Sequence, residues 1–355
     1  MWFDAAASMT MAMTSDAAAV PGPLGNFSAF LASWTPLGDW QLELLLWLQA
    51  LRHPVLTWIM GAVTMLGDDL FYVTVLSVMY WTSSSDLEGG HLARHHCLSS
   101  SPNLYSDSAK RLQNRQNTFD LMQLVVFSVL LNLVIKNLVD APRPFEDFAV
   151  IEGLWTFTAG GASFPSGHAQ TAATFWMALV SAGAGVGMGK RGRLATIGIA
   201  CAFIFLIFLS RLYLGVHWPQ DVLAGGLIGG VLGLIGPTLL KRFSRWCLIP
   251  TLALSGIGIV VFWDHSAMQL TSLLIGATIG HAQTGSDPVG RAKPVWMFLG
   301  IMAVAAAYGT TTWLLTAFGL PALIVDGLAT LETGLMITWG VPALLEAVTS
   351  GFERV

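Results

Sequence analysis

Long apolar runs separated by short polar or basic segments dominate this chain of 355 residues. A helix crosses a bilayer with about 20 predominantly apolar residues, and most of these runs approach or exceed that length. The pattern therefore predicts an all-α fold, in the form of a polytopic helical membrane protein. We expect spans near residues 118–139, 168–188, 194–214, 220–240, 247–263, 267–282, 295–318 and 322–347.

The N-terminal part of the chain is less regular. Residues 1–38 are rich in Ala, Met, Ser and Pro and lack the basic-then-apolar order of a secretory signal, so we expect a poorly ordered or surface-lying leader. Residues 39–51 are too few to span and predict an amphipathic interfacial helix. Residues 54–81 predict two helices separated by a turn at Gly67, whereas residues 82–116 are polar and aperiodic and predict a loop.

Composition supports the membrane interpretation. The chain is 54% hydrophobic with 11% charged residues, and its mean hydropathy is +0.64. A soluble domain carries about 25% charged residues, so a soluble protein is disfavoured. Cys97, Cys201 and Cys247 are scattered without a Cys-x2-Cys pair, which predicts neither a disulfide framework nor a zinc ribbon. No segment is basic and aromatic enough to suggest nucleic acid as a partner.

Short basic segments indicate the orientation of the helices. Lys and Arg are concentrated in the cytoplasmic loops of membrane proteins, and three basic segments lie two spans apart here. They place the loop 140–167 and the turn 213–219 on the opposite, extracytoplasmic face. The segments contain Arg94, Lys110, Arg111 and Arg115; Lys190, Arg191 and Arg193; and Lys241, Arg242 and Arg245.

Three polar strings interrupt the apolar pattern on that face. A charge inside a membrane is costly, so an embedded ionisable residue suggests a function by default. Together the strings supply cations, histidines, a carboxylate and a serine, which are the groups needed to hold a phosphate and to transfer it through a histidine. The strings are Lys136 with Arg143-Pro144, then Pro165-Ser166-Gly167-His168, then Ser210-Arg211 with His217 and Asp221.

The first two strings are suited to anion binding. Arg143 offers a planar fork for phosphate oxygens and Lys136 a compact charge, and the helix break at 140–142 lets both cations turn toward one point. Ser166 and Gly167 precede an apolar run, and the N–H groups of a helix N-terminus bind anions. Taken alone, Lys136 and Arg143 are more simply explained as anchors to lipid headgroups, and the second string is equally well explained as an ordinary helix cap with an interfacial histidine.

The third string supplies a candidate nucleophile. His217 precedes Asp221 by one helical turn, so the carboxylate can reach one ring nitrogen and fix the tautomer while the other nitrogen attacks phosphorus. His168 lies beside the anion-binding string, where it can protonate a leaving oxygen. A lone His-x3-Asp pair is more often structural than catalytic, but three such strings on one membrane face favour phosphotransfer.

The order Lys-x6-Arg-Pro, Pro-Ser-Gly-His and Ser-Arg-x5-His-x3-Asp resembles the three-part signature of the type 2 phosphatidic acid phosphatase (PAP2) superfamily, over roughly residues 40–245. This resemblance implies a six-helix core that places the three strings around one phosphate. It also implies that His217 is the nucleophile, Asp221 its orienting carboxylate and His168 the general acid. The phosphate-binding residues that it implies are Lys136, Arg143, Ser166, Gly167 and Arg211.

The same resemblance implies a hydrolase for a lipid phosphomonoester or pyrophosphate, of the phosphatidate or polyprenyl pyrophosphate type, with a phosphohistidine intermediate. No metal or cofactor is expected, because the cations neutralise the developing charge. The expected partners are a lipid phosphate and the bilayer of a bacterial cell membrane, and the oligomeric state stays open. We divide the chain into a leader (1–38), a catalytic membrane domain (39–245) with a cytoplasmic loop (82–116), and additional C-terminal transmembrane helices (246–355).

Other functions share some of these features. A phosphotransferase of the same chemistry would pass the group to an acceptor alcohol, for which the C-terminal helices offer room. A non-catalytic lipid transporter would need the cations but not His168, His217 and Asp221. Vanadium haloperoxidases share the anion-binding strings, but they are soluble proteins.

Two further polar clusters have ordinary explanations. The cluster His91, His95, His96 and Cys97 imitates a metal site, but its surroundings offer no carboxylate at ligand spacing, so a solvated loop is expected. Asp68 and Asp69 are expected simply as polar residues of a turn.

Overall fold

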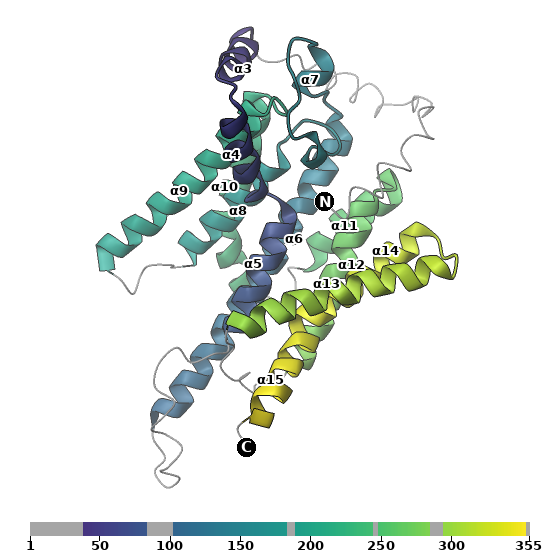
Figure 1. Cartoon of the computed structure of the whole chain (residues 1–355). Coiled ribbons are helices and arrows are strands. Elements are labelled where there is room, and N and C mark those ends of the chain that lie inside the picture. The colour runs from purple at the N-terminus through teal and green to yellow at the C-terminus, as the bar shows by residue number, and fades with distance from the viewer. Residues whose placement is uncertain (1–37, 84–101, 183–188, 244–247, 285–293, 353–355) are drawn as a thin grey trace. The chain divides into compact units, whose positions relative to one another are not determined.

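The computed structural model describes residues 38–83, 102–182, 189–243, 248–284 and 294–352. Helices dominate these segments, so the predicted all-α fold is confirmed (Figure 1). Five helices are long and apolar enough to cross a membrane, or up to six if α4 (Pro54–Met65) and α5 (Asp69–Thr82), which are bent by 52°, form one broken span. The chain is a multi-pass integral membrane protein.

The described residues form two compact units. The first comprises those of Met1–Phe71 and Phe127–Ser244, and the second those of Tyr72–Val126 and Arg245–Val355. This division differs from a boundary at residue 245, because most of α5 and the first part of the long helix α6 (Pro102–Val139) group with the C-terminal helices.

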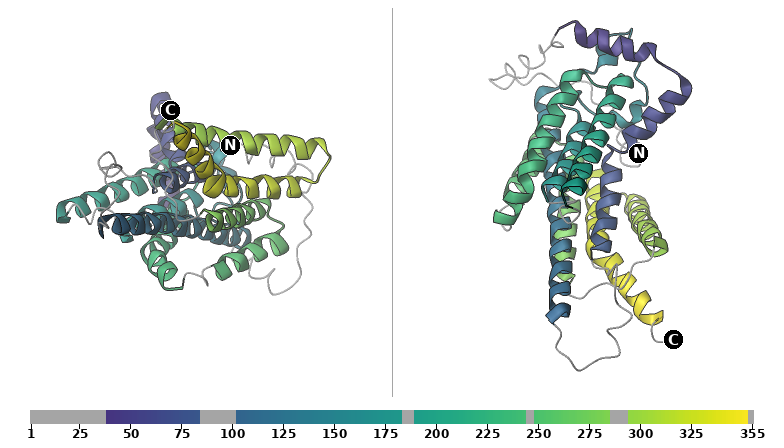
Figure 2. Two further views of the ribbon diagram at one scale, coloured as in Figure 1. Left: turned by 90° about the horizontal axis from the view of Figure 1, so that it is seen from below. Right: turned by 90° about the vertical axis from the view of Figure 1, so that its left-hand side faces the viewer.

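The first unit contains the polar strings. Its α8 packs against α10 and α9, while α3 and α4 pack against α9. The right-hand view in Figure 2 shows α3 and α4, in purple, as separate helices that meet at an angle. Besides α4 and the last part of α6, its elements are α3 (Trp40–Ala50), α7 (Pro144–Asp147), the 3₁₀ turn η3 (Thr156–Thr158), α8 (Gly167–Ser181), α9 (Gly189–Tyr213) and α10 (Pro219–Phe243).

Glycines on α10 bring it very close to α8. A Cβ added at Gly225 would lie 2.5 Å from the Ser166 carbonyl oxygen, and added Cβ atoms at Gly229 and Gly233 would also collide with the α8 backbone. Small residues allow helices in membranes to approach in this way. The close approach at these three positions holds α10 directly against the start of α8.

Two apolar clusters hold the turn between α9 and α10. Tyr213, Leu214 and Val216 are buried against residues of α4 and of the segment 145–159. Trp218 is buried with Leu45 of α3. His217 therefore lies between two anchored residues, Val216 and Trp218, in a turn with little freedom to move.

The second unit consists of further helices that pack on one another. Its α12 packs against α14, and α14 also packs against α13. The indole N–H of Trp81 donates to the Ile337 carbonyl in a π-helical turn, at 2.7 Å. Besides α5 and the start of α6, its elements are α11 (Leu248–Phe262), α12 (His265–Gln283), α13 (Pro294–Ala317), α14 (Ala322–Leu335), the π-helix η6 (Met336–Gly340) and α15 (Val341–Phe352).

Some sequence-based boundaries change. The loop predicted over 82–116 is wrong for its C-terminal half, because α6 begins at Pro102. This part of α6 is polar, and a polar helix lacks the apolar periodicity by which helices are recognised. Helices α8 and α11 have 15 residues each in the described chain, fewer than a simple span needs. Residues 1–37 and the His91–Cys97 cluster lie outside the described residues.

Candidate active site

The three strings meet where α6 ends and where α8 and α10 begin. Helix α6 stops at Val139, and Asp140 adopts a left-handed conformation with φ of 46°. Asp tolerates this conformation better than most residues, and Pro142 cannot continue a helix. The chain therefore turns back after Lys136, and Arg143 becomes buried with 1% of its surface exposed.

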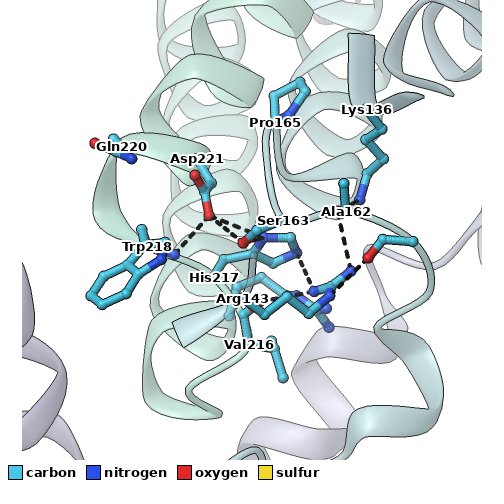
Figure 3. Close-up of polar contacts among 12 residues, drawn as sticks. Lys136, Arg143, Ala162, Ser163, Pro165, Val216, His217, Trp218, Gln220 and Asp221 are labelled. Atoms are coloured by element: carbon cyan, nitrogen blue, oxygen red, sulfur yellow. Dashed lines mark hydrogen bonds and ion pairs between the residues drawn. The ribbon is translucent and has the colours of Figure 1, made fainter. Parts of the chain in front are cut away.

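His217 and Asp221 form a buried pair at the start of α10. His217 Nδ1 lies 3.5 Å from Asp221 Oδ2, as the four-residue spacing allows (Figure 3). The same oxygen accepts a hydrogen bond from the backbone N–H of Trp218 at 2.8 Å. A carboxylate that faces Nδ1 favours the tautomer with the proton on Nδ1, which leaves Nε2 with a free lone pair.

Ser163 contacts both residues of this pair, and sequence reasoning missed it. Its hydroxyl donates to Asp221 Oδ2 at 2.6 Å and lies 3.4 Å from His217 Nδ1 (Figure 3). Ser163 is completely buried. Its position two residues before Pro165 is the available signal, but a serine there reads as an ordinary loop residue until the loop is seen to fold back on α10.

Arg143 approaches His217 from the opposite side. Its Nη1 lies 3.4 Å from His217 Nε2 and donates to the Val216 carbonyl at 2.8 Å. Its Nη2 donates to the Gly160 carbonyl at 2.8 Å and its Nε to the Gly161 carbonyl at 3.0 Å. The nitrogen of His217 that is free of Asp221 therefore points toward a guanidinium, which is where a phosphate group would be held.

Lys136 and Arg211 contact the same loop, residues 158–162. Lys136 Nζ donates to the Ala162 carbonyl. Arg211 Nη1 donates to the Thr158 hydroxyl at 3.0 Å and to the Thr64 hydroxyl of α4 at 2.8 Å, while its Nε is buried without a hydrogen-bond partner in the described chain. The carbonyl and hydroxyl dipoles of the loop offset the mutual repulsion of three neighbouring cations.

Ser166 occupies the N-cap position of α8, but its hydroxyl makes no capping hydrogen bond. The residue is fully buried, and its Oγ has no hydrogen-bond partner within the described residues. Its backbone N–H donates to the Asp221 carbonyl at 3.0 Å, which ties the Pro-Ser-Gly-His string to α10. A buried polar group without a partner is rare and requires an explanation, and a bound anion would supply one here.

A buried amide network supports this string from α6. Asn132 Nδ2 donates to the Pro165 carbonyl at 3.3 Å and to Gln170 Oε1 at 2.9 Å, and Gln170 in turn donates to the Ser128 carbonyl at 2.7 Å. A Cβ added at Gly167 would lie 3.2 Å from Asn132 Oδ1. A larger residue at position 167 would therefore press on the network that holds the loop.

His168 lies beside the turn between α4 and α5. Its Nε2 is buried without a hydrogen-bond partner in the part of the chain that the structure describes. The nearest carboxylate is that of Asp68, with Oδ2 3.9 Å from this nitrogen. Asp68, expected only as a turn residue, is therefore the second residue, after Ser163, that sequence reasoning did not connect with the site.

The electrostatic surroundings act strongly on His217. Burial, together with Arg143, Arg211 and Lys136, holds the pKa of His217 well below its ordinary value of 6.5. The ring is thus neutral at neutral pH, which is the state that can attack an electrophile. Among the described residues there is no group of three or more His, Cys, Asp or Glu side chains that could hold a metal ion.

The arrangement gives an all-α, multi-pass membrane protein in which largely buried histidines, cations and a carboxylate lie together. A model of the PAP2 superfamily matches residues 118–245, which include all three polar strings. This match confirms that residues 118–245 resemble the PAP2 superfamily, as the three polar strings predict.

Curated relatives are similar over about a third of the chain. The chain is 35% identical over 129 residues to lipid A 1-phosphatase of Rhizobium etli, a match that covers 34% of this chain and 50% of that protein. It is 36% identical over 119 residues to phosphatidylglycerophosphatase B of Bacillus subtilis, covering 32% and 55% respectively. The chain thus spans about half the length of the curated relatives that it matches.

A similar solved structure is the crystal structure of a transmembrane PAP2-type phosphatidylglycerolphosphate phosphatase from Bacillus subtilis. The two chains are 25% identical with a TM-score of 0.42, and the match covers 62% of this chain and 94% of that one.

Proposed function

We propose that the chain is an integral-membrane phosphatase that hydrolyses a lipid phosphomonoester or pyrophosphate through a phosphohistidine on His217. The observation that carries this proposal is the placement of His217 between two opposite charges. Asp221 Oδ2 faces Nδ1 at 3.5 Å, and Arg143 Nη1 faces Nε2 at 3.4 Å. One ring nitrogen is held in its protonated form while the other is directed at an anion-binding group, as a nucleophile of phosphoryl transfer requires.

The first half-reaction forms the bond between His217 Nε2 and phosphorus while the bond from phosphorus to the leaving oxygen breaks. The imidazole keeps its Nδ1 proton and gains positive charge, which Asp221 stabilises. His168 gives a proton to the leaving oxygen. Fixed positive groups and hydrogen-bond donors around the phosphate oxygens stabilise the transition state. In this proposal they are Lys136, Arg143, Arg211, the Ser166 hydroxyl and the Gly167 N–H.

The second half-reaction releases phosphate. Neutral His168 accepts a proton from water as the water oxygen bonds to phosphorus and the bond to His217 Nε2 breaks. An acceptor alcohol in place of water would make the protein a phosphotransferase, and a lipid transporter would need neither histidine. We favour hydrolysis because the relatives compared above are named as phosphatases.

Two features support a lipid substrate on the extracytoplasmic leaflet. The site lies at the ends of membrane-spanning helices, where a lipid headgroup can enter while its tail stays in the bilayer. Lys190 and Arg211 lie at opposite ends of α9, and Asp221 and Lys241 at opposite ends of α10. The ends that carry Lys190 and Lys241 are basic and are expected to face the cytoplasm, so the opposite ends, which carry Arg211 and Asp221, face outward. Within this proposal, residues 39–245 contain the six-helix core and 246–355 are an addition to it.

The proposal is tested by phosphate release from purified protein in detergent. The substrates are phosphatidate, a polyprenyl pyrophosphate and a soluble sugar phosphate, with and without glycerol as an acceptor. We expect release from at least one lipid phosphate, in preference to the sugar phosphate, and loss of release in His217→Ala. Glycerol phosphate as the main product would favour the transferase, and binding of every lipid without turnover would contradict an enzyme.

A further inference from the structure

The geometry points to Asp68 as the positioning residue that favours the protonated form of His168 against the surrounding cations, so that the site contains two histidine–carboxylate pairs, one for the nucleophile and one for the acid. This inference rests on the proposed function and adds to it a residue outside the three polar strings. His217 with Asp221 would be the nucleophilic pair, and His168 with Asp68 the acid pair. The pairs come from different parts of the chain, since Asp68 lies in the turn between α4 and α5.

The acid pair answers an electrostatic problem. A general acid must carry a proton before it can give one away, but burial, together with Arg211, Lys136 and Arg143, strongly disfavours the charged form of His168. Neighbouring cations disfavour a second positive charge on an imidazole. His168 therefore needs a carboxylate close to its ring. Asp68, whose Oδ2 lies 3.9 Å from His168 Nε2, is the carboxylate at ion-pair distance.

The turn that carries Asp68 is packed directly against the His168 ring. A Cβ added at Gly67 would lie 3.2 Å from both Cβ and Cδ2 of His168 and 3.0 Å from Ile207. Glycine at position 67 thus allows the backbone to come up to the imidazole, with Asp68 as the next residue. Both side chains are largely buried, with 13% of His168 and 19% of Asp68 exposed. Low exposure strengthens the interaction of a charge pair.

The two oxygens of Asp68 have different surroundings. Oδ1 accepts a hydrogen bond from the backbone N–H of Leu70 at 3.0 Å, which caps the start of α5. Oδ2 is the oxygen that faces His168. A capping role alone requires only one acceptor, and Asn or Ser would provide it equally well. The negative charge directed at His168 is therefore the feature that capping does not explain.

The contrast with Asp221 supports the assignment. Asp221 Oδ2 accepts hydrogen bonds from Ser163 and from the Trp218 N–H, so its charge is shared among several donors. Asp68 Oδ2 instead faces the otherwise unpartnered Nε2 of His168. A carboxylate with fewer competing donors stabilises an imidazolium more strongly.

In the reaction, Asp68 stays ionised throughout. The bond from phosphorus to the leaving oxygen breaks as His217 Nε2 bonds to phosphorus, and the His168 imidazolium passes its Nδ1 proton to the leaving oxygen. Neutral His168 keeps the proton on Nε2, which faces Asp68. The proton taken from water in the second half-reaction then restores the imidazolium.

The test compares two substrates with different leaving groups, which distinguishes a loss of acid catalysis from a loss of protein structure. A poor leaving group, such as the alkoxide of an alkyl phosphate lipid, needs protonation, whereas the nitrophenolate of 4-nitrophenyl phosphate does not. A general acid contributes about 10²- to 10⁴-fold, and Asp68→Asn removes part of that contribution. We therefore expect Asp68→Asn to lower kcat on the alkyl phosphate by about 30-fold or more, and on 4-nitrophenyl phosphate by less than about threefold. Asp68→Ser, which keeps a cap acceptor, should show the same selectivity, and Asp68→Glu should recover part of the alkyl activity.

Asp326→Asn is the matched control, because Asp326 Oδ2 also faces a histidine, His265 Nδ1 at 3.6 Å, outside the site. It should leave the activity on both substrates within about twofold of the parent, because the pair lies outside the site. An equal loss on both substrates in Asp68→Asn and Asp68→Ser, or no loss in either variant, would overturn the role of Asp68 while the active parent chain still supports the proposed function. A parent chain that releases no phosphate from any substrate would overturn both.

Discussion

The Ser163 hydroxyl donates a hydrogen bond of 2.6 Å to Asp221 Oδ2, the same oxygen that faces His217. Asp221 is thereby held by Ser163 from the loop before α8 and by the Trp218 N–H from the start of α10. The direction of the carboxylate, and with it the tautomer of His217, depends on two segments that only the folded chain brings together.

Ser163→Ala should therefore lower kcat with little change in KM. A hydrogen bond to a charged group contributes about 1.5–3 kcal/mol, so we expect a loss of about 10- to 100-fold. Steady-state kinetics on one lipid phosphate measures it. Ser181→Ala is the control, because that hydroxyl donates to the Leu234 carbonyl away from the site. A rise in KM with unchanged kcat would show instead that Ser163 acts in substrate binding.

The depressed pKa of His217 sets the acidic side of the pH profile. Burial and the neighbouring cations lower this pKa from 6.5, so the free imidazole persists as the pH falls through 6.5 and is lost only at lower pH. Protonation of His217 should therefore contribute to the acidic limb of kcat/KM, which reports the free enzyme, only well below pH 6.5.

Removing one cation should move that limb. Lys136→Met takes away a charge that lowers the pKa of His217, so the acidic midpoint should rise, by about half a unit to one unit, whatever the loss in absolute rate. Lys190→Met, at the far end of α9, should leave the midpoint unchanged. A downward shift in Lys136→Met would contradict the electrostatic account.

Phosphate release should continue in the presence of EDTA. The proposed chemistry neutralises phosphate charge with Lys136, Arg143 and Arg211 rather than with a metal ion, so chelation removes no participant. Activity of the purified protein after dialysis against chelator checks this. Activity that is lost in chelator and restored by added Mg²⁺ would assign the charge neutralisation to a metal.

The orientation of the site can be measured by labelling. Cysteines introduced separately at Ala149, which is exposed beside the site, and at Ser108 in α6 would be compared in a chain without its native cysteines. A membrane-impermeant thiol reagent on intact cells should label position 149 and not position 108, because the basic segments predict a cytoplasmic 108. The reverse pattern would place the site in the cytoplasm.

The sequence is sufficient to predict that two site residues lie close together where a short, fixed spacing links them. One helical turn joins His217 to Asp221, and the break at 140–142 returns Arg143 toward Lys136, so local geometry alone indicates these approaches. The apolar runs likewise predicted most of the helices, because the bilayer demands a minimum apolar length.

Other features depend on contacts between distant segments, which no local pattern reveals. Ser163 reaches Asp221 only because its loop folds back on α10, and Asp68 reaches His168 only because Gly67 lets a turn pack against the ring. The polar start of α6 was missed since helix prediction relied on apolar periodicity.

Trapping the phosphorylated protein tests the central claim most directly. The chain would be quenched in alkali during turnover, because phosphohistidine survives alkali, and the modified peptide identified by mass spectrometry. We predict phosphate on His217, no adduct in His217→Ala, and turnover by that variant at least about a thousandfold below the parent. An adduct on another residue, or turnover by His217→Ala within about tenfold of the parent, would contradict the account.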